Sequence, residues 1–243
     1  LMTDGVGLAT VADSFAAIEQ RVVEEGRLTW DGLKEILDAD FEGAEHIRLM
    51  LKTIPRFGSG NSRADFWAER IRDAYVANFD TPTAKGYKIL PGLFSHGDIV
   101  YLGKIVPATP NGRHAGAPIS HSSEPDPGFA RRGSSAPTAK AVAVARVQPG
   151  RGNSAPLQLD IDRKLMADEG GIETVAAIIL AHNEQGGTLI NLNLVSKEQI
   201  LEAHKDPEKF PDLVVRVTGY SAFVHALSPE YRQQVVDRIL AEE

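Results

Sequence analysis

The chain has 243 residues, of which 42% are apolar and 24% are charged, as in an ordinary soluble globular protein of one large or two small domains. Its net charge of -7, without a concentrated basic patch, argues against a nucleic-acid partner, and no apolar run approaches the roughly 18 residues of a membrane span. We therefore expect a cytoplasmic protein without a membrane partner. The absence of cysteine excludes disulfides, thiolate metal sites and cysteine nucleophiles within this chain, and no metal site is predicted.

The first half of the chain is predicted to be mainly helical after a glycine-bearing loop at the N-terminus. Apolar residues recur at helical spacing in four segments, which are 11–25, 30–39, 46–52 and 64–78. Two short apolar runs bounded by Gly and Pro, 88–93 and 98–102, are strand candidates. The loop between them holds His96.

A long loop rich in Pro and Gly is predicted over residues 107–137. Loops of this length inside compact domains are usually functional or disordered. Asn111 and Gly112 form a turn pair, because both residues tolerate a positive φ. By these local rules the pair is a simple surface turn, and the neighbouring Arg113 is solvated.

The second half alternates helical and strand patterns, which predicts parallel crossovers. Segment 136–147 fits a helix or a strand, and a helix packed on a sheet is favoured. The other predicted helices are 171–185, 197–204 and 229–242, and the other strands are 155–161 and 188–195. In the last strand Asn191 and Asn193 share one face, where they either bind a substrate or lie wet on an edge strand.

The segment over residues 213–222 predicts a short buried strand that ends in Gly219. Its string Arg216-Val-Thr-Gly-Tyr-Ser-Ala222 resembles the radical loop of the glycyl radical enzymes, a family that includes pyruvate formate-lyase and radical diol lyases. The matching glycine of that family, here Gly219, stores a radical on its α-carbon. Glycine suits this role because a planar α-carbon radical would be crowded by any side chain, and because glycine has wide backbone freedom.

Two further segments are similar to the same family. Pro110-Asn-Gly-Arg113, followed by Ala-Gly and Pro, resembles a second family motif, and Arg238 matches an arginine that recurs beyond the radical glycine. The resemblance implies that these residues support the radical loop in a water-poor site. The implied support residues are Arg216, Thr218, Tyr220, Ser221, Asn111, Gly112, Arg113 and Arg238. The resemblance also implies that the loop with His96 is part of the barrel wall, which makes His96 a candidate residue close to a substrate.

The resemblance implies an α/β fold, namely the C-terminal part of a ten-stranded α/β barrel with the radical loop and a closing helix. It divides the chain into residues 1–106, with helices and the first barrel strands of that part, and residues 107–243, the glycyl radical domain. In that family a cysteine outside the radical domain becomes the thiyl radical that attacks the substrate. Since this chain has no cysteine, we expect it to store the radical without turning over a substrate alone.

The implied function is that of the radical-storing part of an oxygen-sensitive, anaerobic lyase or dehydratase. The expected partners are an S-adenosylmethionine and [4Fe-4S] activating enzyme, which installs the radical, and an N-terminal half that carries the cysteine, with a homodimer as the complete enzyme. No cofactor is expected to be bound. The alternatives are a radical spare part that repairs an oxygen-cleaved enzyme, and a non-catalytic α/β binding protein.

Overall fold

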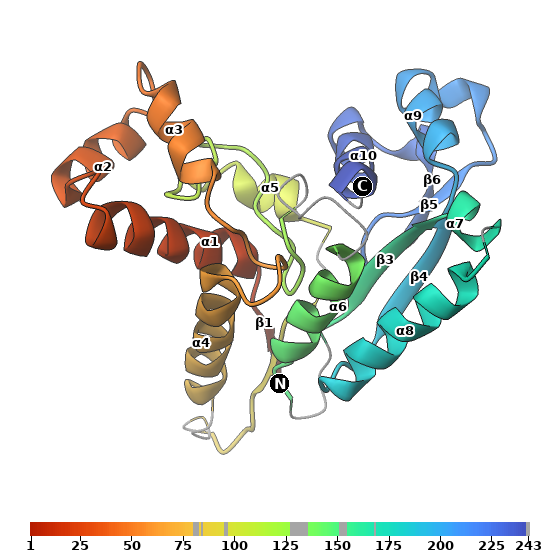
Figure 1. Ribbon diagram of the computed structural model, residues 1–243, viewed down its shortest axis with the longest axis horizontal. Coiled ribbons are helices and arrows are strands. Elements are labelled where there is room, and N and C mark those ends of the chain that lie inside the picture. The colour runs from red at the N-terminus through yellow and green to blue at the C-terminus, as the bar shows by residue number, and fades with distance from the viewer. Residues whose placement is uncertain are drawn as a thin grey trace.

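The computed structural model describes residues 1–79, 83, 85–94, 97–126, 136–150, 155–167 and 169–241. The fold is α/β, and the elements lie in two lobes that Figure 1 shows side by side. The helices are α1 (Leu8–Ile18), α2 (Trp30–Asp38), α3 (Glu45–Lys52), α4 (Arg63–Ala77), α5 (Ile99–Gly103), α6 (Ala136–Arg146), α7 (Arg163–Ala167), α8 (Gly171–Glu184), α9 (Lys197–Lys205) and α10 (Pro229–Ala241). The strands are β1 (Met2–Asp4), β2 (Leu90–Gly92), β3 (Leu157–Asp162), β4 (Ile190–Val195), β5 (Val214–Arg216) and β6 (Ser221–Phe223).

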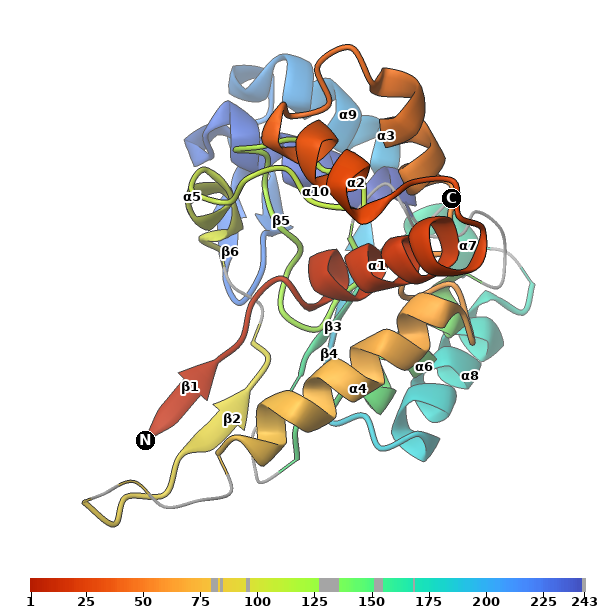
Figure 2. The same cartoon turned by 90° about the vertical axis from the view of Figure 1, so that its left-hand side faces the viewer.

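The first lobe is built on the packing of α1 against α4 (Figure 2). The buried face of α1 consists largely of alanines, and it meets Ala64 and Ala68 of α4. Small side chains let two helices approach closely, so the larger aromatic rings are left at the rim. There Phe15 stacks on Trp67 with 4.8 Å between the ring centroids. The four helices predicted in this half are confirmed, and α1 continues as a π-helical turn over Glu19–Glu24.

Two predictions at the edge of this lobe were wrong. Residues 2–4 form β1, which pairs in parallel with β2, where a loop was expected. Residues 98–102 were expected as a strand, but 99–103 form the helix α5. In α5 the buried residues are Ile99, Val100 and Gly103, a helical spacing, and an added Cβ at Gly103 would lie 2.2 Å from the carbonyl oxygen of Ala117. Close packing against that backbone therefore overrides the β propensity of the apolar run.

The second lobe contains the parallel pair β3–β4, joined through α7 and α8. Helices α6 and α8 pack on one face of this pair, where the apolar core includes Val144, Leu157, Leu159 and Ile178. The parallel crossover predicted from the alternating pattern is confirmed here. The second predicted crossover, from strand 188–195 into the strand before Gly219, was wrong, because β5 does not join this sheet but pairs antiparallel with β6.

The paired strands of the described residues form three two-stranded sheets. A ten-stranded barrel is therefore not visible among these residues, and it remains a prediction. Across the same described ranges, no helix is both long and apolar enough to cross a bilayer.

Candidate functional site

Gly219 lies at the tip of a β-hairpin formed by β5 and β6. The register pairs Val214 with Phe223 and Arg216 with Ser221, and the amide of Val217 donates to the carbonyl of Tyr220 at 3.0 Å. The hairpin therefore turns over two residues, Thr218 and Gly219. Since glycine has no side chain, the tip presents bare backbone at this position.

The two faces of this hairpin differ in burial. Val215 and Val217 are buried against α9 and α10, whereas Val214 is 51% exposed. Thr218 is buried, but Gly219, Tyr220 and Ser221 are exposed. The resemblance implies a site for Gly219 from which water is excluded. The described residues alone do not build such a site, because the tip of the hairpin extends beyond the apolar core that packs against its strands.

Arg238 of α10 binds the hairpin from behind, beneath the turn. It is buried, and its guanidinium donates to the carbonyl oxygens of Val217 at 2.7 Å and Arg216 at 2.5 Å. Its Nε donates to a carboxylate oxygen of Asp160 on β3. Arg238 therefore joins the last two residues before the turn to the central sheet. Arg216 itself points to Ser221 across the hairpin, with Nη1 3.5 Å from Oγ.

Asp160 belongs to a row of polar residues on the face of β3–β4 opposite α6 and α8. Gln158 is opposite Asn191 in the register, and Asp160 is opposite Asn193. The Nδ2 of Asn193 donates to Oδ1 of Asp160 at 2.9 Å. Asn193 is thus in the same hydrogen-bonded group as the hairpin, whereas no such bond is found for Asn191 in the described ranges.

A second buried ion pair lies beside this group. The Nζ of Lys140 is 3.6 Å from Oε1 of Glu124, and it donates to the carbonyl oxygen of Gln158 at 2.5 Å. The same Glu124 oxygen accepts the amide of Gln158 at 2.5 Å. Burial raises the pKa of Glu124, and the charge of Lys140 opposes that shift. Two buried ion pairs, Asp160–Arg238 and Glu124–Lys140, therefore lie beneath the hairpin in addition to its apolar core.

The segment with Asn111, Gly112 and Arg113 is a compact loop in which Thr109 and Arg113 form an antiparallel bridge. Arg113 is buried, so the solvated surface turn that local rules predict is wrong. Its guanidinium donates four hydrogen bonds, all to backbone carbonyls of its own segment. The acceptors are Val106 (3.0 Å), Pro107 (2.5 Å), His114 (2.8 Å) and Ala117 (2.7 Å).

The first lobe holds this loop from the other side. Gly112 has a φ of +85°, and an added Cβ would lie 2.5 Å from Cγ of Lys52 on α3. Arg48 donates to the carbonyl of Gly112 at 3.1 Å, and Arg56 to that of Asn111 at 2.6 Å. These contacts place the loop against α3 rather than on the hairpin, and no hydrogen bond between the two is found among the described residues.

Two carboxylates, the buried Asp13 and the half-buried Asp126, flank the same loop. Asp13 accepts the amide of Phe57 at 2.8 Å and lies 3.3 Å from Arg56. Desolvation raises the pKa of Asp13 to about 6, against the lowering effect of Arg56. Desolvation likewise raises the pKa of Asp126 to about 7, with a further rise from the charge of Asp13. Both carboxylates therefore titrate close to neutral pH.

Helix α5 connects the loop and the hairpin in space. The carbonyl of Ala117, which accepts from Arg113, packs against Gly103 at one end of α5. Just before the other end, an added Cβ at Gly97 would lie 3.3 Å from Cε1 of Tyr220 and 3.7 Å from Oγ1 of Thr218. The segment after His96 thus touches the turn that carries Gly219. His96 itself lies outside the described residues.

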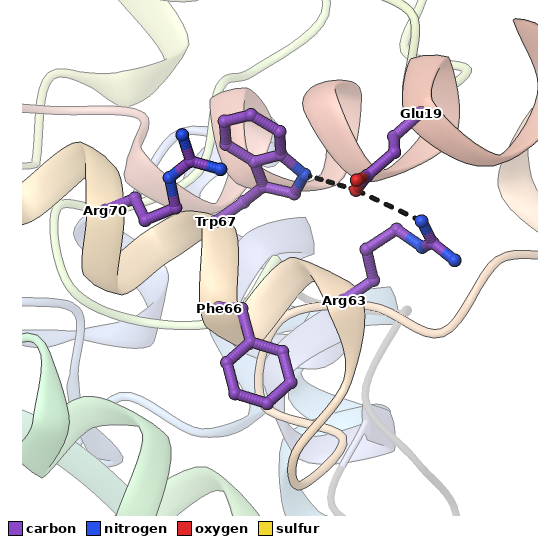
Figure 3. Close-up of a pocket in the computed structure, with 5 residues that line it drawn as sticks. All are labelled: Glu19, Arg63, Phe66, Trp67 and Arg70. Atoms are coloured by element: carbon purple, nitrogen blue, oxygen red, sulfur yellow. Dashed lines mark hydrogen bonds and ion pairs between the residues drawn. The ribbon is translucent and has the colours of Figure 1, made fainter. Parts of the chain in front are cut away.

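A surface depression of about 380 Å³ lies in the first lobe, between α1 and α4 (Figure 3). The Nε1 of Trp67 donates to Glu19 at 2.8 Å, Arg63 is 3.1 Å from the same carboxylate, and Arg70 stacks 4.4 Å from the centroid of the Trp67 ring. None of these residues belongs to the predicted site. The depression is explained by the rim packing of α1 on α4.

Comparison with known proteins agrees with the motif. The family model "Pyruvate formate lyase-like" matches residues 1–103, and the model "Glycine radical" matches residues 124–224. The chain belongs to the glycyl radical enzyme family. It is 30% identical over 236 residues to trans-4-hydroxy-L-proline dehydratase of Clostridioides difficile, which covers 96% of this chain and 30% of that protein.

Other members of the glycyl radical enzyme family give the same picture. The chain is 32% identical over 242 residues to isethionate sulfite-lyase of Bilophila wadsworthia (strain 3_1_6), with 96% of this chain and 28% of that protein covered. A solved structure described as "1,2-propanediol Dehydration in Roseburia inulinivorans" superposes with a TM-score of 0.88 at 29% identity, and covers 98% of this chain and 31% of that one. The chain thus spans less than a third of the length of these relatives.

Several residues around the hairpin and around the loop with Arg113 were not predicted from the sequence. They are Asp160, Glu124 and Lys140 below the hairpin, and Asp13, Asp126 and Arg56 around the loop. A signal did exist for Asp160, because Gln158 and Asp160 alternate with Leu157, Leu159 and Ile161. Polar residues at every second position of a buried strand indicate a polar inner face.

Proposed function

We propose that this chain is the radical-storing part of a lyase or dehydratase of the glycyl radical enzyme family, with Gly219 as the radical carrier. The observation that supports the proposal most is the position of Gly219 at an exposed two-residue tip. The strand before this tip is bound by Arg238. A projecting glycine on a fixed base can be reached by a second protein without unfolding the lobe beneath it.

The proposed chemistry has two hydrogen-atom transfers. An activating enzyme that uses S-adenosylmethionine and a [4Fe-4S] cluster removes one hydrogen atom from the α-carbon of Gly219, which leaves an unpaired electron shared between the flanking amide groups. The glycyl radical then takes a hydrogen atom from a cysteine thiol outside this chain, so that glycine is restored and a thiyl radical forms. That thiyl radical would act on the substrate.

The complete enzyme would require residues beyond those of this chain. The chain has no cysteine, and its tip is exposed, so a second protein portion must supply both the thiol and the cover over Gly219. We propose that this portion completes the ten-stranded barrel, that the complete enzyme is a cytoplasmic homodimer, and that residues 1–106 and 107–243 are its two units here. Arg216, Thr218, Tyr220 and Ser221 would position the tip, and Asn111, Gly112 and Arg113 would support it through α5.

The substrate side of the proposal rests on the polar face of the sheet. Asn193 is bonded to Asp160, so its amide is committed to the hairpin base. Asn191 is half-buried on the same face, and His96 precedes a residue that touches the hairpin tip. We propose Asn191 and His96 as residues close to the substrate, with Asn193 in a supporting role.

The test is anaerobic incubation with an activating enzyme, followed by electron paramagnetic resonance. The wild-type chain should give a doublet from the single remaining α-hydrogen, and Gly219→Ala, which has no glycine at this position, should give none. Air should then cut the wild-type backbone at Gly219 and release a short C-terminal peptide that mass spectrometry detects. If the wild-type chain gives no signal with any of several activating enzymes, the alternative of a non-catalytic binding protein is favoured. Repair of an oxygen-cleaved relative after mixing would instead identify a spare part.

A further inference from the structure

We infer that Asp160, with Asn193, is a positioning residue for the radical turn and acts through Arg238. This inference rests on the proposed function of Gly219. It adds a residue on β3 that the radical motif does not contain.

The geometry forms a continuous series of contacts from the sheet to the turn. Asn193 on β4 donates to Oδ1 of Asp160 on β3, and the other carboxylate oxygen of Asp160 accepts from Nε of Arg238 on α10. The two remaining nitrogens of that guanidinium donate to the carbonyls of Arg216 and Val217. Each of the three guanidinium nitrogens of Arg238 therefore donates a hydrogen bond, one to the sheet and two to the strand before the turn.

Burial makes this arrangement specific. Asp160 is 7% exposed and Arg238 is 6% exposed, so water cannot easily replace either partner. A buried arginine that lost its carboxylate would be left with an uncompensated charge, and it would turn toward another anion or toward solvent. In either case the carbonyls of residues 216 and 217, immediately before the Thr218–Gly219 turn, would lose their donors.

The neighbouring charges do not replace Asp160 in this role. Glu124 is paired with Lys140 at 3.6 Å and accepts the amide of Gln158, so its carboxylate is engaged on the adjacent part of β3. Within the described ranges, the hairpin strands are three residues each, and the side-chain hydrogen bonds found for them are those of Arg238 and the one between Arg216 and Ser221. The apolar side of the hairpin packs on α9 and α10. The position of the tip therefore depends on the contact between Asp160 and Arg238.

The test compares Asp160→Asn, Asn193→Ala and the matched control Asp162→Asn in the 243-residue chain. Asp162 is two residues along the same strand, and its carboxylate accepts the amide of Lys164 at 2.8 Å at the start of α7. Amide hydrogen exchange of residues 213–224 is the first readout, with α1 and α4 as internal reference. The second is the shape of the electron paramagnetic resonance doublet in the chains that become activated, which a residue needed only for folding would not alter.

We expect Asp160→Asn to speed exchange of the hairpin amides roughly ten- to a hundredfold, Asn193→Ala to speed it less, and Asp162→Asn to leave it unchanged. Among activated chains, Asp160→Asn should broaden the doublet. Hairpin exchange equal to wild type in Asp160→Asn, or equal loosening of α1 and α4, would overturn the inference. If Asp160→Asn does not fold, Asn193→Ala decides by the same criterion. A wild type that never becomes radical would refute the proposed function alone, because the exchange experiment needs no radical.

Discussion

Two arginines organise the two motif-bearing segments, and they do so in opposite ways. Arg113 donates its four hydrogen bonds to carbonyls within seven residues of itself, so its loop is closed by its own side chain. Arg238 donates to carbonyls 21 and 22 residues away and to a carboxylate 78 residues away. The loop is therefore locally determined, whereas the hairpin depends on three separate elements.

This contrast indicates that the loop with Arg113 is the more rigid of the two segments, and that the hairpin with Gly219 is the more easily loosened. Removal of the Arg113 side chain would affect a loop that packs between α3 and α5, and it would therefore also affect the core around these helices. Loosening the contact between Arg238 and Asp160 frees only a short hairpin whose tip is already exposed. The proposed radical carrier, which would meet two different partners, is better placed on the second kind of support.

The largest effect is expected for Arg113→Ala. Four carbonyls would lose their donor in a buried site, which should lower the free energy of unfolding by about 3–5 kcal/mol. Chemical denaturation measures this, and exchange in α3 should speed up together with the loop. Arg113→Lys is the control, since lysine keeps the charge but cannot donate to four carbonyls, and it should recover only part of the loss. An effect below about 1 kcal/mol would contradict the closed loop.

A second effect follows from the carboxylates beside that loop. Burial raises the pKa of the Asp13 carboxyl from its ordinary value of 3.8 to about 6, and that of Asp126 from 3.8 to about 7. Between the ordinary and the raised pKa values, the folded chain binds more protons than the unfolded chain. The contribution of these two carboxyls to the free energy of unfolding is therefore fully present below about pH 4, and it is lost as the pH rises to about 7. For Asp13 the shift corresponds to roughly 3 kcal/mol.

Thermal unfolding at pH 5 and pH 8 tests this sign. Because Asp13 and Asp126 ionise between these two pH values, the wild type should unfold at a lower temperature at pH 8 than at pH 5. Asp126→Asn, which cannot ionise at this position, should show a smaller difference between the two unfolding temperatures. Asp162→Asn is a suitable control because Asp162 lies on β3, away from the loop. A pH dependence that is unchanged in Asp126→Asn would show that Asp126 ionises normally in the folded state.

A smaller effect is expected for Gly112→Ala. The positive φ of Gly112 and the distance of 2.5 Å from an added Cβ to Cγ of Lys52 predict a loss of about 1–3 kcal/mol. Gly116→Ala is the matched control. It has a φ of +74° but nothing within 4 Å of the added Cβ, so it reports the backbone strain alone. Equal losses for the two variants would show that contact with α3 does not contribute.

The smallest effect compares one helix cap in each lobe. Ser62 accepts the amide of Asp65 at 3.1 Å in a reciprocal capping box, whereas Ser196 accepts the amide of Gln199 at 3.4 Å. Ser62→Ala should cost about 1 kcal/mol and Ser196→Ala less. Denaturation midpoints measure both, and a larger loss for Ser196→Ala would show that the longer hydrogen bond does not make the weaker cap.

The sequence by itself determined the local elements and the radical motif. Helical spacing placed α2, α4, α8 and α10 within one or two residues of their observed bounds, because caps such as Thr29 and stop glycines such as Gly186 are local signals. The string around Gly219 likewise carries its identity in neighbouring residues. Local signals failed for residues 98–102, where contact with the backbone of Ala117 selects a helix.

Only the tertiary structure decided which charges meet. Asp160 and Arg238 are 78 residues apart, and Arg56 lies 43 residues from Asp13, so no spacing rule could pair them. Burial of these groups depends on how β3, α10 and the loop pack together, and of the four it is Asp13 whose pKa is raised by that burial. The tertiary structure likewise showed that the tip with Gly219 is exposed, since residues distant in sequence form the core beneath it.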